Sequence, residues 1–430
     1  MRSIWSASED PGGSTEPQGP PSTPVTLVKR LSVLLIAPQP FFSDRGTPIA
    51  VRMAAEAMGA EGHQVDLLTL PHGKDVEMSN VTVHRVREIP GVNGVPIGPS
   101  WQKLLYDGRI AWAARRMLRS KEYDVMHGVE DGALIAWRLS QSRYGVPFIY
   151  DMDSHLSAQL REKGSFYGRA AGLFERLEAA ALRDALGVLA VCPALVDVAR
   201  EHRARNDVTH LPDTPLNEGE SPPPASYMTA LSGPRVVYVG NLQVYQGIDL
   251  LVEAFALVAR AHPDAHLVVV GGRPDHIQKY EDKVARLVPH GRVTFLGPRP
   301  LADLGAVLTA SDVLVSPRLQ GINTPMKIYS YLESGKPVVA TRLPTHTQVL
   351  SDEVACLVDP VPESLADGIS LLLADPTAAA TLGQRGQRFV RREYGAERFR
   401  ERLREFYLEV GESLYGNSEG EDGDIPQPVS

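Results

Sequence analysis

The chain has 430 residues, of which 43% are hydrophobic and 22% are charged, and its formal net charge is −8. This length exceeds what one ordinary hydrophobic core supports, so it predicts a globular protein of two domains. The negative net charge argues against nucleic acid as a partner, because such binding depends on neutralising phosphates. The two cysteines, Cys192 and Cys356, form no metal-binding spacing, which favours a reduced, cytoplasmic setting.

Two terminal segments have the composition of disordered chain. Residues 1–28 are rich in Pro, Gly and Ser, and residues 417–430 are acidic and contain Pro. Neither segment holds enough apolar side chains to offset the entropy lost on ordering. The N-terminal segment lacks the basic and then apolar pattern of a signal peptide, and no stretch approaches the roughly 20 apolar residues of a membrane span.

Between these tails, short apolar strands alternate with helical segments. The first series of strands is predicted at 31–38, 64–70, 81–86, 124–128, 147–153 and 187–192. The second series is predicted at 235–240, 266–272, 293–297, 313–317, 337–341 and 355–358. This alternation is typical of doubly wound α/β domains.

The composition also predicts where the domains end. A stretch rich in Pro, Ser and Gly, 216–234, is the expected linker between a first domain at 29–215 and a second domain at 235–395. A final amphipathic helix, 396–416, can pack on either domain or cross back to the first one. Two such domains facing each other form a cleft, where ligands favour the carboxyl ends of the strands.

The stretch 316–341, SPRLQGINTPMKIYSYLESGKPVVAT, has the pattern of a strand, a loop and a capped helix. Asn323 or Thr324 can cap a helix over 324–334, and the free N–H groups at its start favour an anion. Lys327, one turn into that helix, and Arg318, on the preceding loop, can add positive charge. Residue types alone describe an ordinary capped helix with a surface lysine at least as well.

The same stretch resembles the donor-binding segment of family-4-type retaining glycosyltransferases (glycosyl transferases group 1), which have the GT-B fold. SGKPVVAT (334–341) matches that family in full, and ASDVLVSP (310–317) and VVYVGNLQVYQGIDLLVEAF (236–255) also resemble its motifs. In the first half the matches are looser, among them GHQVDLLT, YDVMHG and GVPFIYDMD. The resemblance covers about residues 31–410. It implies two Rossmann-like domains, a nucleotide-sugar donor held by the second one, no required cofactor or metal, and retention of the sugar's anomeric configuration.

The chain departs from the family at the donor site. Where the family has an arginine and a lysine on the donor diphosphate, this chain has Asn241 and Gln246, which donate hydrogen bonds but carry no charge. The family's second glutamate, which holds ribose hydroxyls, is replaced by Ser330, with Glu333 nearby on another helix face. The first glutamate has no clean counterpart, and the nearest polar residues are Gln320 and Asn323.

In the first domain, polar residues follow the predicted strands at the edge where a cleft would lie. His127 ends a buried strand, and the resemblance places Asp153 where the family has a histidine near the reacting sugar. We predict both as catalytic, although Asp153 is equally consistent with a structural role. Gly46, with Arg45 beside it, corresponds to a family loop near the donor phosphates. The other polar residues at this edge are Glu130, Asp151, His155 and Asp213.

The resemblance implies a retaining transfer from a UDP-, GDP- or ADP-sugar to a saccharide or lipid-linked acceptor. The base would lie near the loops after Gly240 and Gly297, and the diphosphate would meet Lys327, which we predict as catalytic. The remaining predicted donor-binding residues are Asn241, Gln246, Arg318, Asn323, Thr324, Ser330 and Glu333. The leaving group is already good, so catalysis needs charge stabilisation and positioning more than a strong acid. The base, the sugar, the acceptor and the oligomeric state stay open.

Two other functions remain open at this stage. The altered donor positions are also those expected of a non-catalytic homologue that acts as a nucleotide-binding scaffold, and a two-domain sugar-nucleotide epimerase is a weaker alternative. A basic amphipathic segment, 103–121, can contact an anionic membrane surface, which would make the enzyme peripheral at the inner face of the membrane. Such a segment more often packs its apolar side on its own domain.

Overall fold

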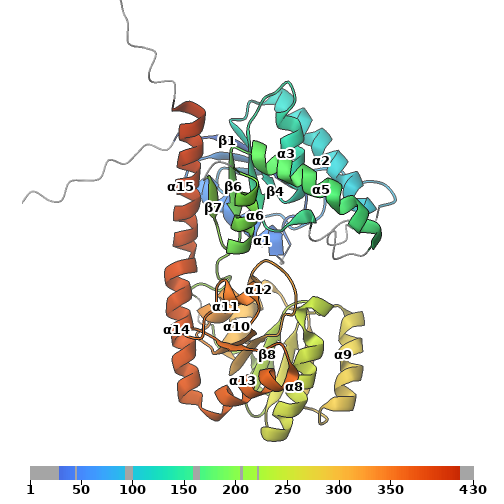
Figure 1. The fold of residues 1–430 in the computed structure, drawn as a ribbon, viewed down its shortest axis with the longest axis vertical. Coiled ribbons are helices and arrows are strands. Elements are labelled where there is room, and N and C mark those ends of the chain that lie inside the picture. Colours follow the sequence, from blue (N-terminus) through green and yellow to red (C-terminus); the bar gives the residue numbers. More distant parts are fainter. Residues whose placement is uncertain are drawn as a thin grey trace, which may run out of the picture.

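The computed structural model describes residues 29–43, 46–92, 100–157, 165–203, 207–219 and 222–416, with the backbone alone at 165–171. Both predicted tails and Arg45 lie outside the described residues. The described chain forms two α/β units stacked along the long axis of the molecule, with the last two helices running along one side of both (Figure 1). No helix in these ranges is both long and apolar enough to cross a bilayer.

The first sheet has seven parallel strands in the order β3-β2-β1-β4-β5-β6-β7. Its central strands are almost wholly buried because helices cover both faces, which explains their continuous apolar runs. The strands are β1 Ser32–Ala37, β2 Gln64–Thr69, β3 Val81–Arg85, β4 Val125–Val129, β5 Phe148–Met152, β6 Gly187–Ala190 and β7 Val208–His210. The helices are α1 Gly46–Ala60, α2 Trp101–Ser120, α3 Asp131–Ser140, α5 Ser165–Asp184 and α6 Pro193–Glu201.

The second sheet has six parallel strands in the order β10-β9-β8-β11-β12-β13. The strands are β8 Arg235–Val239, β9 His266–Val270, β10 Val293–Gly297, β11 Val313–Ser316, β12 Val338–Thr341 and β13 Cys356–Val358. The helices are α7 Ser226–Thr229, α8 Ile248–Ala261, α9 Pro274–Leu287, α10 Leu304–Thr309, α11 Lys327–Glu333, α12 Pro344–Thr347 and α13 Pro362–Ala374, with 3₁₀ turns η1 Val244–Gln246 and η2 Leu301–Asp303. The predicted pair of doubly wound domains is therefore confirmed.

One functionally important helix begins later than predicted. The sequence pattern indicated a helix over 324–334 capped by Asn323 or Thr324, but α11 begins at Lys327, and Met326 stands at its N-cap without a side-chain hydrogen bond. The chain just before it is held by shorter turns, in which the Ile328 N–H donates to the Pro325 carbonyl over 2.9 Å. Lys327 is thus the first residue of a seven-residue helix, and the predicted capping of the 324–334 helix was wrong.

The last two helices link the domains. In α14, Pro376–Tyr394, the Asp375 carboxylate accepts the N–H groups of Thr377 and Ala378 as an N-cap. After a break at Gly395, α15, Ala396–Tyr415, runs beside the first domain, as its position next to β1 and β7 shows (Figure 1). The apolar stripe of α15 enters the hydrophobic core on one face of the first sheet; its members are Phe399, Leu403, Phe406, Tyr407 and Val410. The C-terminal helix therefore crosses back and completes the first domain's core.

Candidate active site

The carboxyl ends of the two sheets face each other. The Gln348 side chain, at the end of α12, accepts the Ala194 N–H over 3.3 Å and donates to the Ile322 carbonyl over 2.9 Å. Ile322, on the loop after β11, also packs against the core of the first domain. These contacts join the loops that follow β6 and β11, so side chains at the carboxyl ends of both sheets meet at one place, as expected for paired α/β domains.

Lys327 lies across the end of β8 on the second-domain side. Its Nζ donates to Gln246 Oε1 over 3.0 Å and sits 4.0 Å from the centre of the Tyr238 ring. Within the described chain, no carboxylate lies within ion-pair distance of this ammonium group. Burial, followed by the nearby Arg318 charge, lowers the pKa of Lys327 well below its ordinary value. A half-buried cation that lacks a carboxylate partner is suited to bind an anionic ligand.

Gly240 makes room for this lysine. Its φ is +153°, and a Cβ added to it would lie 2.8 Å from Tyr238 Oη and 3.1 Å from Lys327 Nζ. A side chain here would displace the ammonium group, so the position requires glycine for both space and backbone conformation. Gly240 therefore lies beside Lys327, and its role at a donor site stays a prediction. Gly297, the last residue of β10, has a φ of +66°, and its carbonyl accepts the Gly271 N–H over 2.8 Å.

Arg318 faces its own loop. Its Nε donates to the Gln320 carbonyl over 2.7 Å, and its Nη2 lies 3.3 Å from Asn323 Oδ1. The guanidinium carbon also lies 5.3 Å from the centre of the Tyr245 ring. Arg318 therefore shapes the loop after β11 and adds positive potential beside Lys327. Asn323 supports Arg318 and does not cap a helix.

Asn241 and Gln246, which replace the family's diphosphate-binding arginine and lysine, differ in burial and in hydrogen bonding. Gln246 is buried, and its Oε1 accepts hydrogen bonds from Lys327 and from Tyr238 Oη, the latter over 3.3 Å. The side-chain carbonyl of Gln246 therefore accepts a hydrogen bond from Lys327. We had expected the amide group of Gln246 to donate a hydrogen bond to the ligand. Asn241 is exposed, with Oδ1 accepting the Gln243 N–H over 3.1 Å. Its amide group is 3.3 Å from Tyr245 Oη.

Ser330 and Glu333 are buried and form contacts within the protein, with the linker and with α14. Ser330 is 1% exposed, and its Oγ accepts the Leu216 N–H from the interdomain linker over 3.0 Å. Glu333 is 2% exposed and forms a two-pronged ion pair with Arg391 of α14, its Oε1 lying 2.7 Å from Nη2. In this conformation neither side chain is available to donor ribose hydroxyls. Thr324 is also buried, and its hydroxyl has no hydrogen-bond partner among the described residues.

The opposite, first-domain side carries carboxyl groups. Asp153 follows β5, and its pKa is raised well above the ordinary value by burial, by Asp151 and by the further charges of Glu130 and Asp213, while a hydrogen bond with Thr47 opposes that shift. Asp213 is buried, and burial together with Asp151 raises its pKa to about 7. Asp153 follows β5 and Asp213 follows β7, and these two parallel strands end at the same edge of the sheet. The two carboxyls therefore lie at that edge.

His127 is placed in the protein interior. It is 0% exposed, and its ring nitrogens lie 2.8 Å from Tyr407 Oη and 3.1 Å from Asp151 Oδ2. In this conformation its ring has no exposed surface for a ligand to contact, and its predicted catalytic role stays a prediction. His155, two residues after Asp153, contacts Ser157 Oγ over 2.9 Å and the buried Glu178 over 3.3 Å.

Three residues in or behind the site were missed by the sequence reasoning. Tyr238 lies beneath Lys327, Thr47 contacts Asp153, and Tyr407 contacts His127. Tyr238 carried a weak signal, since it is a polar-tipped aromatic in an otherwise apolar strand. Gly46, which precedes Thr47, is exposed at the start of α1, where an added Cβ would meet no atom within 4 Å.

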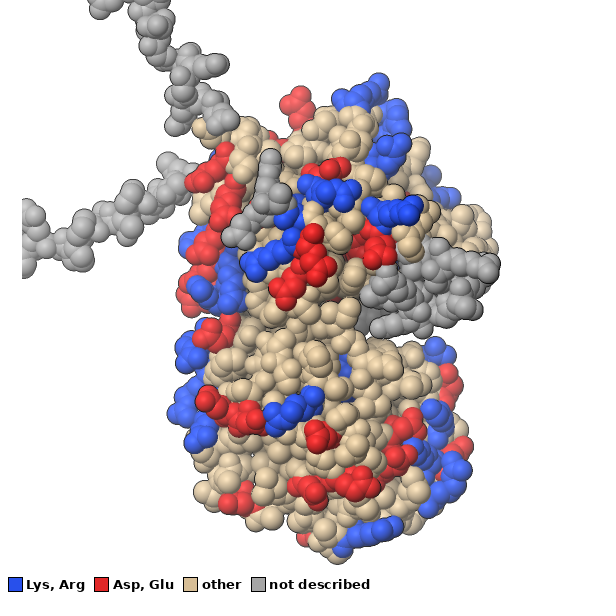
Figure 2. Space-filling model, viewed as in Figure 1, with Lys and Arg blue, Asp and Glu red and all other residues tan. Residues whose placement is uncertain are grey.

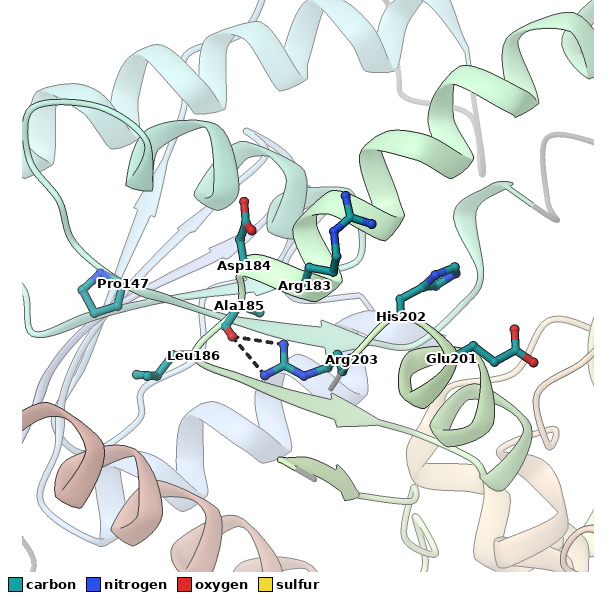
Figure 3. A pocket seen from close by; sticks show the side chains of 8 residues that line it. All are labelled: Pro147, Arg183, Asp184, Ala185, Leu186, Glu201, His202 and Arg203. Atoms are coloured by element: carbon teal, nitrogen blue, oxygen red, sulfur yellow. Dashed lines mark hydrogen bonds between the residues drawn. The ribbon is translucent and has the colours of Figure 1, made fainter. Parts of the chain in front are cut away.

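A pocket of about 700 Å³ lies elsewhere, at the amino ends of β5 and β6 (Figure 3). Its Arg203 is fully engaged, since its guanidinium donates to the Ala185 carbonyl over 3.0 Å and to Asp207 over 2.7 Å. We therefore assign this pocket no part in the site. The described residues contain no group of three or more potential metal ligands.

Comparison with known proteins agrees with this architecture. Residues 45–212 match the family model described as glycosyl transferase 4-like domain, and residues 233–375 match glycosyl transferases group 1. Sucrose-phosphate synthase from Thermosynechococcus elongatus superposes with a TM-score of 0.73 at 23% identity, covering 88% of this chain and 98% of that one. Anabaena HepE, solved with UDP and glucose, gives a TM-score of 0.67 at 19% identity, covering 87% and 99%.

Two sequence relatives are named for their activities. Phosphatidyl-myo-inositol mannosyltransferase of Mycobacterium leprae is 27% identical over 367 residues, which are 83% of this chain and 91% of that protein. D-inositol 3-phosphate glycosyltransferase of Corynebacterium glutamicum is 31% identical over 158 residues, covering 35% and 37%. The fold and these relatives define the class: the protein is a glycosyltransferase with the GT-B fold. Within that class it belongs to the glycosyl transferases group 1, with a glycosyl transferase 4-like first domain.

Proposed function

We propose that this glycosyltransferase transfers a sugar from a nucleoside-diphosphate sugar to an inositol-containing, lipid-linked acceptor, with retention of the anomeric configuration. The observation that carries the donor part is Lys327, a half-buried ammonium group without a carboxylate partner in the described chain, placed beside a glycine that leaves it uncovered. The diphosphate would take the position next to Lys327 Nζ, with the Arg318 charge behind it. Charge-assisted hydrogen bonds of this kind are roughly twice as strong as neutral ones.

The first-domain carboxyls would face the acceptor and the transferred sugar. A carboxyl whose pKa is raised, as that of Asp153 is, can both donate and accept hydrogen bonds with hydroxyl groups. In the reaction, the bond between the sugar's anomeric carbon and the diphosphate breaks and a bond to the acceptor oxygen forms on the same face. Lys327 would stabilise the charge left on the departing nucleoside diphosphate.

The acceptor class comes from the relatives. Two of them are named for activities on phosphatidyl-myo-inositol and on D-inositol 3-phosphate, and both of these compounds contain an inositol ring. A lipid-linked acceptor requires the enzyme to approach a membrane, and α2 exposes Trp101, Leu104 and Trp112 on a helix that also carries several arginines. Basic side chains gather over this part of the first domain (Figure 2). Aromatic and basic side chains on one helix favour peripheral contact with an anionic membrane.

A thermal-shift screen against UDP, GDP, ADP and their sugars tests the donor site. We expect one nucleotide to raise the melting temperature, because a ligand that binds only the folded state stabilises it by roughly 2.7 kcal/mol at a hundredfold excess over its Kd. The selected sugar nucleotide is then assayed for transfer to phosphatidylinositol vesicles and to free inositol phosphate. Transfer to vesicles alone supports the lipid-linked acceptor, and transfer to inositol phosphate alone contradicts it.

Lys327→Ala should abolish the nucleotide-induced shift and lower kcat by about 100-fold, the range seen when a group that stabilises developing charge is removed. Its unliganded melting temperature should stay the same or rise, because a cation with a lowered pKa is costly to bury. Lys279→Ala, on the exposed face of α9, is the control and should leave both activity and binding intact. Wild-type protein that binds a nucleotide but transfers no sugar to either acceptor would favour the non-catalytic scaffold, which the comparisons do not support. Turnover of the nucleotide sugar without an acceptor to an isomeric sugar nucleotide would favour an epimerase.

A further inference from the structure

A chain of hydrogen bonds runs from the last helix to the first-domain carboxyls. Tyr407, on α15, has its Oη 2.8 Å from His127 Nδ1, and His127 Nε2 lies 3.1 Å from Asp151 Oδ2. Tyr407 is 1% exposed and His127 is 0% exposed, so water does not compete for these contacts. Tyr407 and His127 are 280 residues apart in sequence and meet only because α15 crosses back to the first domain.

The chemistry of the three groups fixes the direction of the hydrogen bonds. A carboxylate only accepts hydrogen bonds, so His127 Nε2 is the donor to Asp151 Oδ2. In the imidazole tautomer that carries its proton on Nε2, Nδ1 is an acceptor, and the Tyr407 hydroxyl is the donor beside it. Burial raises the pKa of Tyr407 well above its ordinary value, so the hydroxyl keeps its proton. Tyr407 thereby selects one tautomer of His127, as an orienting group does in other catalytic arrangements.

Within the described residues, the Tyr407 hydroxyl is the hydrogen-bond donor beside His127 Nδ1. The nearest second ring, His63, has its centre 5.1 Å from that of Tyr407, and its Nδ1 already accepts the Leu31 N–H over 3.1 Å. On the other side, Asp151 belongs to β5 and Asp153 follows the end of that strand, so the hold on Asp151 also bears on the backbone that carries Asp153. Burial, with the Asp151 charge as a further cause, raises the pKa values of Asp153 and Asp213.

We propose that Tyr407 is a positioning residue for sugar transfer: through His127 it fixes the tautomer that holds Asp151, which lies on β5 two residues before Asp153. The inference rests on the proposed role of these carboxyls in the reaction. A purely structural tyrosine would need only its ring, since phenylalanine fills nearly the same volume in the core. The hydroxyl is required only if the polar chain matters.

The test compares two variants of the full chain. Tyr407→Phe removes the hydroxyl and keeps the ring, and we expect kcat to fall about 10- to 100-fold, the effect of a small misplacement at a reacting centre. The Kd for the nucleotide selected by thermal shift should stay within twofold, because Lys327 lies on the other domain. The control is Phe406→Leu, the neighbouring α15 residue that packs on Gly187. It should lower the melting temperature and leave kcat of the folded protein unchanged.

Nitrogen-15 NMR of histidine-labelled protein gives a second readout, with the His127 signals assigned by His127→Gln. Wild-type protein should show His127 protonated at Nε2, and Tyr407→Phe should change that pattern while Phe406→Leu should not. An active wild type with a fully active Tyr407→Phe variant would overturn the positioning role, as would an unchanged His127 signal in that variant. Equal losses of kcat in both variants would also overturn it, because packing alone would then explain them. A wild type without any transfer activity would instead refute the proposed function.

Discussion

The two sides of the candidate site carry different ionisable groups, basic side chains on the second domain and carboxyls on the first. On the second domain, Lys327 and Arg318 lie at the carboxyl end of the sheet, and Lys327 has no carboxylate partner among the residues described. On the first domain, Asp151, Asp153 and Asp213 gather where the strands end, and burial, followed by the Asp151 charge, raises the pKa values of Asp153 and Asp213. Each side is electrostatically costly by itself, and burying unpaired charge is rarely tolerated without a use.

This difference agrees with the proposed division of the substrates between the two domains. A nucleoside diphosphate is anionic and would relieve the excess positive charge of the second domain. Hydroxyl groups of a sugar or an inositol are neutral donors and acceptors, and they suit carboxyls that are partly protonated. In the proposed function, the second domain would hold the charged donor and the first domain the neutral acceptor, and the following variants test this assignment.

Asp153→Asn should have the largest effect on the acceptor side. It keeps the size of the side chain and removes its ability to ionise, so we expect kcat to fall about 100-fold, as for loss of a group that assists proton movement. Nucleotide binding measured by thermal shift should be unchanged. Asp275→Asn, on the surface of α9, is the matched control. Weaker nucleotide binding in Asp153→Asn would show that the charge separation between the domains is false.

Gly240→Ala should act on the donor side by displacing Lys327. The new Cβ would lie 3.1 Å from the ammonium nitrogen at a φ of +153°, so we expect nucleotide Kd to rise about tenfold, equal to about 1.4 kcal/mol. Isothermal titration calorimetry measures this directly. Gly108→Ala in α2, where an added Cβ meets no atom within 4 Å, should leave Kd unchanged. Equal Kd values for the two variants would remove Gly240 from the donor site.

Asp213→Asn should change how stability depends on pH, with the smallest effect on activity. The pKa of Asp213 is raised from 3.8 to about 7, so the folded protein binds the extra proton between these values and loses that stabilisation as pH rises towards 7. We therefore compare the melting temperature of the variant with that of the wild type at each pH. The difference, variant minus wild type, should be larger at pH 8 than at pH 5 by at least about 2 °C. Scanning calorimetry of both proteins at the two pH values measures it, and a constant difference would mean that Asp213 is ionised throughout.

Much of the fold follows from local sequence, because apolar runs and glycine-bounded turns are local signals. The exceptions are short or irregular: β7 has only three residues, and α11 starts after Pro325 instead of at Thr324. The sequence also indicates Lys327, Gly240 and Asp153, since they follow strands at predictable offsets.

The missed features depend on contacts between distant segments. Ser330 and Glu333 were expected at the donor ribose, but their partners, Leu216 and Arg391, belong to the linker and to α14. Nothing near either residue in the sequence reveals those partners. In the same way Tyr407 looks like one more apolar position of an amphipathic helix until α15 is placed against β4. Local pattern therefore predicts which residues can act, while tertiary contacts decide which of them are already engaged.

The crossing of α15 has a consequence for how the protein is made. The first domain emerges first from the ribosome, yet part of its core, including Phe399, Leu403 and Phe406, is encoded near the end of the chain. One face of its sheet therefore lacks the side chains of α15 until the whole second domain has been synthesised. The domain that is translated first therefore completes its core last. Its apolar face stays exposed the longest, and we expect chaperones that bind apolar surface to act there.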